Sequence, residues 1–232
     1  MRRLGIATLT IVAAVVAGCT HGKEFARPAP DSLVLGQTDR AAVLTQYGEP
    51  IRRSTVVVTN GNELKTDPQS AFSHAPELGT YETIIFRYAD TTGTFLVGSP
   101  ALSKIIAFDF WNDKLIAYNF VSSFEADSSN FNEGMMPLLE KGRTTKEKAI
   151  DILGTPTGRS GFPSVQGQGD EKFIYQYFDV SRTQRTSKRL EVLFGADGVL
   201  KDYRFVSDTQ PYAVPTGNTY TPVYIPPPRR GK

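Results

Sequence analysis

LVLGQTDRAAVLTQYGEP, residues 33–50, aligns without a gap with LEKGRTTKEKAIDILGTP, residues 139–156. Each copy begins with Gly-x-Thr and ends with Gly-x-Pro, and apolar side chains recur between them at helical spacing. A threonine can cap the first turn of a helix, so we expect Thr38 and Thr144 to be N-caps. A glycine can take the left-handed conformation that ends a helix, as we expect of Gly48 and Gly154. The repeat predicts two short amphipathic helices.

After each copy the apolar period changes from helical to alternating, which is typical of β-strands. Turn-forming residues separate the last two alternating segments, at Asn112-Asp113 in the first copy and at Asp197-Gly198 in the second. We therefore expect two successive α+β units, residues 31–125 and 126–210. The alternating segments are 83–88, 104–110 and 115–121 in the first unit, and 173–178, 189–194 and 199–206 in the second.

The N-terminal segment has the order of a bacterial export signal. Residues 1–3 (MRR) are cationic, residues 4–17 are largely apolar, and Gly18 precedes Cys19. The run VAGC at 16–19 resembles a lipobox, which implies that residues 1–18 are a lipoprotein signal peptide and that Cys19 carries lipid. Residues 19–30, which have few apolar side chains, would form a lipidated tether. The plainer alternatives are an ordinary signal peptide or a buried free cysteine.

Composition restricts the classes of partner. Removal of residues 1–18 would leave equal numbers of basic and acidic side chains, which argues against nucleic acid as a ligand. Cys19 is the only cysteine, so an intramolecular disulfide is excluded. We expect membrane association through the lipid, and Thr20 after the cysteine favours the outer membrane. Residues 211–232 are rich in proline and are predicted to be a disordered tail.

The lipobox, the Gly-x-Thr helix closed by Gly-x-Pro and the three strands that follow together resemble the BamE (SmpA/OmlA) family of outer-membrane lipoproteins. The resemblance covers both copies, although BamE itself has one such domain. It implies an α+β fold in which two tandem copies of a helix pair pack on a three-stranded antiparallel sheet. It also implies a periplasm-facing accessory or scaffold protein of an envelope complex, with the β-barrel assembly machinery as a candidate partner.

A second resemblance supplies the main alternative. A β-lactamase inhibitory protein of similar tandem architecture implies a periplasmic inhibitor that grips an enzyme with its sheet face. Both resemblances imply protein binding without catalysis. The discriminating feature would be the partner, which is an envelope complex in the first case and one soluble enzyme in the second.

Candidate catalytic and metal-binding groups are sparse. His21 and His74 are the only histidines and do not form a pair at ligand spacing. The glycine-containing stretches 158–161 (GRSG) and 167–169 (GQG) fit neither a nucleophile elbow nor a phosphate loop, and they are predicted to be flexible loops. We therefore expect no metal, no cofactor and no enzymatic activity. A hydrolase that uses carboxylates such as Asp109 and Asp113 is the remaining alternative.

One face of the first predicted sheet is the best candidate for a binding surface. Alternation places five residues opposite the face that packs on the helix. They are Ile105, Asp109 and Trp111 on one strand, and Leu115 and Asn119 on the next. Trp111 would be the anchor, because aromatic residues dominate binding hot spots. We expect this face to be covered by a partner protein, by the second unit or by the segment 51–80. The corresponding face of the second unit, around Arg189 and Glu191, is predicted to be solvated.

Overall fold

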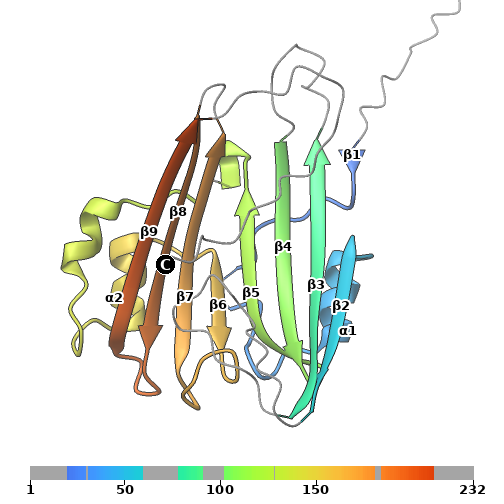
Figure 1. Cartoon of the computed structure of the whole chain (residues 1–232), viewed down its shortest axis with the longest axis horizontal. Helices are drawn as coiled ribbons and strands as arrows, with labels where there is room; N and C mark the ends of the chain where they lie inside the picture. Colours follow the sequence, from blue (N-terminus) through green and yellow to red (C-terminus); the bar gives the residue numbers. More distant parts are fainter. Residues whose placement is uncertain are drawn as a thin grey trace, which may run out of the picture.

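One antiparallel sheet runs through both halves of the chain (Figure 1). The computed structural model describes residues 20–29, 31–59, 78–90, 102–127, 129–180 and 184–211. The strand order is β1-β3-β4-β5-β6-β7-β8-β9, and β2 pairs with the same edge of β3 as β1 does. The strands are β1 (Thr20–His21), β2 (Arg52–Val58), β3 (Gly79–Asp90), β4 (Leu102–Trp111), β5 (Lys114–Ser122), β6 (Gly158–Gly161), β7 (Glu171–Val180), β8 (Gln184–Phe194) and β9 (Leu200–Pro211).

Four short helices accompany the sheet in the part of the chain that the structure describes. The α-helices are α1 (Arg40–Tyr47) and α2 (Lys146–Leu153), and the 3-10 helices are η1 (Glu125–Asp127) and η2 (Glu133–Leu138). Figure 1 shows α1 and α2 behind the strands, on the same side of the sheet. No helix within the described residues is long and apolar enough to span a membrane.

The expected fold of two helix pairs, each on its own three-stranded sheet, is wrong. The structure is mostly β, and the N-terminal half (β1–β5 with α1) and the C-terminal half (β6–β9 with α2) share one sheet. The join is β6, which pairs with β5 on one edge and with β7 on the other. Sequence reasoning missed β6 because its residues, GRSG, carry no apolar alternation. The union of the sheets also means that "tandem BamE-like domains" does not describe this protein.

The two predicted helices form, with one correction at their start. Gly48 and Gly154 have positive φ angles of 85° and 82° and follow the last helical residues, as expected. The N-caps, however, are Asp39 and Thr145. Thr38 and its counterpart in the second copy instead accept hydrogen bonds from backbone N–H groups four residues earlier. These threonines therefore stabilise the turn before each helix and leave the cap position to the next residue.

Each helix closes a hydrophobic core against the same face of the sheet. Val43 and Tyr47 of α1 pack with Phe86, Phe108 and the rest of the first cluster. The second cluster surrounds α2 and comprises Phe131, Leu139, Ala149, Leu153, Phe173, Tyr175, Leu190, Val192, Phe194 and Leu200. Alternation along the strands therefore directs one set of side chains to the helices and the other set to the opposite side, which we call the open face.

The segment 20–29, predicted to be an exposed tether, packs on the protein. Phe25 lies in the first core, with its ring centroid 5.7 Å from that of Tyr47 and 6.3 Å from that of Phe120. Two residues further on, the guanidinium of Arg27 donates a hydrogen bond to the carbonyl of Thr155 in the C-terminal half. This segment ties both halves together on the helix side. Cys19, residues 1–18 and residues 212–232 lie outside the described residues, as do residues 60–77 of the segment between β2 and β3.

Candidate functional site

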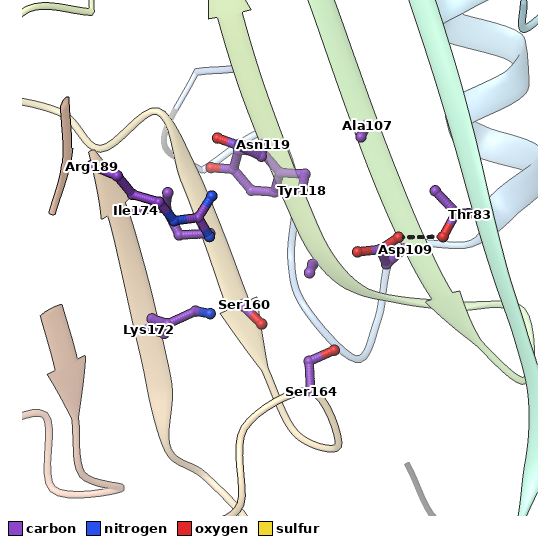
Figure 2. Close-up of a pocket in the computed structure, with 11 residues that line it drawn as sticks. Thr83, Ala107, Asp109, Tyr118, Asn119, Ser160, Ser164, Lys172, Ile174 and Arg189 are labelled. Carbon is purple, nitrogen blue, oxygen red and sulfur yellow. Dashed lines mark hydrogen bonds between the residues drawn. The ribbon is translucent and has the colours of Figure 1, made fainter. Parts of the chain in front are cut away.

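The open face has a hollow of about 240 Å³ at its centre, where the two halves of the sheet meet. Figure 2 shows Thr83 and Asp109 on one side of it and Lys172 and Arg189 on the other. The lining residues come from the six neighbouring strands β3 to β8 and from the loop after β6. They are Thr83, Ala107, Asp109, Ala117, Tyr118, Asn119, Ser160, Ser164, Lys172, Ile174 and Arg189.

Short side chains make the floor of the hollow. Asp109, Ala117, Ser160 and Lys172 are successive cross-strand partners, so they form one row across β4, β5, β6 and β7. Side chains on one face of neighbouring strands stand side by side, and the two in the middle of this row are small. In the next row along the strands, Gly158 of β6 is paired with Asn119 of β5 and adds no side chain. The hollow exists because small residues lie between longer ones.

Buried charges form the wall on the β7–β8 side. Lys172 Nζ lies 3.3 Å from Glu191 Oε1, and the side chains of these residues are only 1% and 3% exposed. Arg189 Nη2 lies 2.8 Å from the same carboxylate oxygen. Arg189 also donates through Nη1 to Gln176 Oε1, at 3.3 Å. Ion pairs and hydrogen bonds from several strands hold these side chains, so the wall is pre-formed.

The opposite wall is acidic and polar. Thr83 Oγ1 donates a hydrogen bond to Asp109 Oδ1 at 2.7 Å, between neighbouring strands β3 and β4. Between the walls, Asn119 Nδ2 donates to Gln176 Oε1 at 2.6 Å, although Asn119 is on β5 and Gln176 is on β7. This bond reaches across the short strand β6. It links the two halves of the sheet on the open face, as the segment 20–29 does on the helix side.

The loop after β6 supplies a hydroxyl group and an aromatic contact. Ser164 lines the hollow, is 3% exposed, and its Oγ has no hydrogen-bond partner among the described residues. Figure 2 places Ser164 at one end of the hollow, below Ser160. In the same loop, Phe162 meets Trp111 of β4 edge to face, with ring centroids 6.3 Å apart and planes at 86°. Val165 is fully buried and fixes this loop against the protein.

The structure brings together four of the five residues predicted for the binding face. Ile105, Asp109, Trp111 and Asn119 lie on the open face, and two of them, Asp109 and Asn119, line the hollow. Leu115 is the exception, because it is fully buried in the first core. A β-bulge between β4 and β5 pairs Phe110 with Leu115 and Asp109 with Ala117, which leaves one extra residue on β5. Because of this extra residue, the side chain of Leu115 points to the helix side of the sheet and not to the open face.

Sequence reasoning missed the other wall. The face around Arg189 and Glu191 was predicted to be solvated, but Glu191 is 2% exposed. Alternating charged residues on a strand are typical of a solvated face, and only the neighbouring strand shows that Lys172 and Arg189 share one carboxylate. Ser160 and Ser164 were missed because they lie in or beside the stretch that was predicted to be a loop. No signal in the sequence pointed to them.

A second ion-pair group lies on the helix side, behind the hollow. Glu171 at the start of β7 contacts Arg159 of β6 and Lys146 of α2, with 2.8 Å between Lys146 Nζ and Glu171 Oε2. Burial by itself would raise the pKa of Glu171, but the hydrogen bonds from Arg159 and Lys146 outweigh it and lower the pKa. The group fixes β6 and β7 to α2. It therefore supports the floor of the hollow from behind.

The described residues contain no group of three or more His, Cys, Asp or Glu side chains placed to hold a metal ion. The hollow offers hydrogen-bond donors on one wall and acceptors on the other. Binding of a polar ligand is the chemistry that this arrangement supports.

Comparisons with known proteins found a distant structural similarity. No family model matches the chain, and no curated protein matches it. A crystal structure described as a "putative beta-lactamase inhibitor protein" from Streptococcus mutans is similar over 73% of this chain and 82% of that one. The sequence identity is 12% and the TM-score is 0.40. The resemblance to the BamE family is wrong, because no family model supports it and the sheet is continuous.

Proposed function

We propose that this protein is a non-enzymatic binding protein that holds a partner protein on its open face. The observation that carries the proposal is the combination of an aromatic pair, Trp111 with Phe162, and a polar hollow beside it on a face that neither α-helix covers. Antiparallel sheets commonly pack one face on a core and present the other. Trp, Tyr and Arg side chains dominate protein-binding energetics, and this face carries Trp111 at the end of β4 and Arg189 on β8.

Apolar side chains extend the surface on both sides of the hollow. Ile105 is 40% exposed, Val206 is 49% exposed and Val56 is 37% exposed. The strand register puts all three on the open face, on β4, β9 and β2 respectively. Non-obligate protein interfaces contain both apolar and polar area, and this surface contains both.

We propose inhibition of an enzyme as the form of binding. The hollow's walls are held by ion pairs and hydrogen bonds before any partner arrives. A surface that is ordered in advance loses little conformational entropy on binding, and pre-organised faces of this kind are common in enzyme–inhibitor complexes. We also propose attachment to the outer membrane through lipid on Cys19, with an envelope protein as the partner. The lipid proposal rests on the sequence of residues 1–19.

The test is capture of a partner from detergent-solubilised envelopes, with full-length wild-type protein and with two variants. Trp111→Ala changes the open face, and Ile51→Ala removes an apolar side chain that is 60% exposed and lies outside it. We expect Trp111→Ala to reduce capture by about ten-fold, as truncation of a hot-spot residue does, and Ile51→Ala to have no effect. The captured protein should be an enzyme, and its activity should fall in proportion to added wild-type protein.

Two results would contradict the proposal. Equal capture by Trp111→Ala and wild type, with both folded by circular dichroism, would remove the open face as the interface. Turnover of a substrate by the purified protein would contradict the non-enzymatic function. A Cys19→Ser form with a cleavable signal tests the anchor, because it should capture the partner but leave the membrane fraction.

A further inference from the structure

We infer that the hollow receives a carboxylate group of the partner, presented by an Asp or Glu side chain on a peptide segment. The inference rests on the proposed function and specifies which group of the partner enters the open face. The carboxylate would lie at the end of the hollow that Lys172 and the hydroxyl of Ser164 line, with Arg189 farther along the β7–β8 wall (Figure 2).

The first observation is the sign of the charge at that end. Lys172 and Arg189 are both cationic, and both are arranged around the single carboxylate of Glu191. These three side chains together carry two positive charges and one negative charge. Lys172 is 1% exposed, so its ammonium is largely removed from bulk water. Charge interactions are stronger there than at an exposed surface, because the effective dielectric constant is lower.

The second observation is the hydroxyl of Ser164. Its Oγ is buried and has no partner among the protein groups. Buried hydroxyl groups without a hydrogen bond are rare in folded proteins, because desolvation of the group is then not compensated. A hydroxyl that lines a cavity can donate to a ligand in that cavity. A carboxylate oxygen is an acceptor that makes a short and strong bond with such a donor.

The third observation is the distance between the two walls. Asp109 and Lys172 are separated by three strand spacings, which is about 14 Å between Cα atoms. Lys172 and Asp109 therefore come from strands on opposite sides of the hollow (Figure 2). Asp109 faces the other end of the hollow, where it can accept a hydrogen bond from an N–H group. A peptide segment with an acidic side chain offers both groups.

The size of the hollow agrees with one side chain and part of its backbone. A water molecule takes about 30 Å³ in the liquid, so 240 Å³ corresponds to about eight waters. The small floor residues Ala117 and Ser160 leave this space open. A larger side chain at either position would fill it from below without contact with the core, since both point to the open face.

The first experiment fills the hollow and leaves the rest of the open face unchanged. Ala117→Leu occupies the space, Ser164→Ala removes only the hydroxyl, and Ala42→Leu on the exposed side of α1 is the matched control. We expect Ala117→Leu to lower the affinity for the captured partner by more than about ten-fold. Ser164→Ala should lower it by about ten-fold, which is the effect of losing one charge-assisted hydrogen bond. Ala42→Leu should not change the affinity. Thermal unfolding of each variant establishes that it is folded.

The second experiment identifies the chemistry with peptide probes, by two-dimensional NMR of the whole protein. The probes are a short glycine peptide with one Glu and both ends blocked, the same peptide with Gln, and an all-glycine peptide with a free C-terminal carboxylate. We expect the Glu peptide to shift the amide signals of Ser160, Ser164 and Lys172 in wild type but not in Ala117→Leu. The Gln peptide should shift none of them. Shifts by the free carboxylate alone would assign the site to chain termini and overturn the side-chain proposal.

The outcomes separate this inference from the proposed function. If Trp111→Ala abolishes capture while folded Ala117→Leu and Ser164→Ala leave it unchanged, the hollow is not used and only the present inference fails. If none of the three variants affects capture, the open face is not the interface and the proposed function fails. Equal shifts by the Glu and Gln peptides would also overturn the carboxylate assignment.

Discussion

Lys172 Nζ lies 3.3 Å from Glu191 Oε1 on the open face, and both side chains are almost completely removed from solvent. Arg189 shares the same carboxylate oxygen from its position two residues earlier on β8. Two charged groups are therefore buried on the sheet face that neither α-helix covers, and Arg189, which is 16% exposed, is partly buried beside them. Their burial sets both the shape of the hollow and the cost of altering it.

The shared carboxylate predicts unequal effects of removing the two partners. Glu191→Gln leaves Lys172 and Arg189 close together without their anion, and we expect it to lower the free energy of unfolding by about 3 kcal/mol. Lys172→Met leaves Glu191 paired with Arg189, so we expect a clearly smaller loss. Urea denaturation of both variants gives the comparison. A larger loss for Lys172→Met would show that Arg189 does not compensate for the lysine.

The junction between the halves predicts a strict requirement for glycine at position 158. A Cβ atom added there would lie 2.4 Å from the carbonyl oxygen of Tyr118 and 2.9 Å from Cα of Asn119, both on β5. Gly158→Ala should therefore push β6 away from β5 and destabilise the protein by about 2 kcal/mol, as other overpacking substitutions do. The matched control is Gly161→Ala, whose nearest neighbour is the movable side chain of Leu35 at 3.3 Å. Equal thermal stabilities of the two variants would contradict the close approach.

The packed segment 20–29 predicts that Phe25 contributes to global stability. Phe25→Ala removes an aromatic ring from the first core and should lower the free energy of unfolding by about 3 kcal/mol. Ala26→Ser, at the exposed neighbouring position, should change it by less than about 0.5 kcal/mol. Chemical denaturation measures both effects. A negligible effect of Phe25→Ala would indicate that this segment is a free tether, as the sequence alone suggests.

The ion pairs of Glu171 predict a dependence of stability on acid pH. The pKa of Glu171 is lowered in the folded protein from its ordinary value of 4.5, so the unfolded chain binds the proton first. The stabilisation is therefore complete above about pH 4.5 and is lost as the pH falls through the lower, folded-state value. We expect the difference in unfolding free energy between wild type and Glu171→Gln to be constant near neutral pH and to shrink in acid. A difference that stays constant down to about pH 3 would contradict the assigned shift.

Local residue patterns predicted the individual helices and strands better than they predicted how the strands pair. All six alternating segments lie within or almost within observed strands, and both helices end at the predicted glycines. The error in fold class arises at Gly158–Gly161, where four residues with no apolar pattern pair on both sides and unite the halves. Cross-strand pairing uses backbone groups, which every sequence provides. A short strand of this kind has no signature in the side chains.

The residues of the candidate site also fall into two groups, those that local patterns placed correctly and those that only the structure could place. Asp109, Asn119 and Trp111 could be placed on one face because a strand's side chains alternate with a period of two residues. Leu115 was misplaced because one bulged residue reverses that alternation, and its position depends on the register of two strands. Arg189 and Glu191 were predicted to be solvated because their burial depends on contacts across β7 and β8, including the contact of Glu191 with Lys172.

The sequence by itself determined the two α-helices, the glycines that end them and six of the strands, since capping, left-handed turns and apolar periodicity act over a few neighbouring residues. Only the tertiary structure decided that the strands form one sheet, that Phe25 closes the first core, and that a hollow opens between Asp109 and Lys172. These features depend on contacts between residues far apart in the chain. The free energy of such contacts comes from packing and from paired charges, which the order of residues does not display.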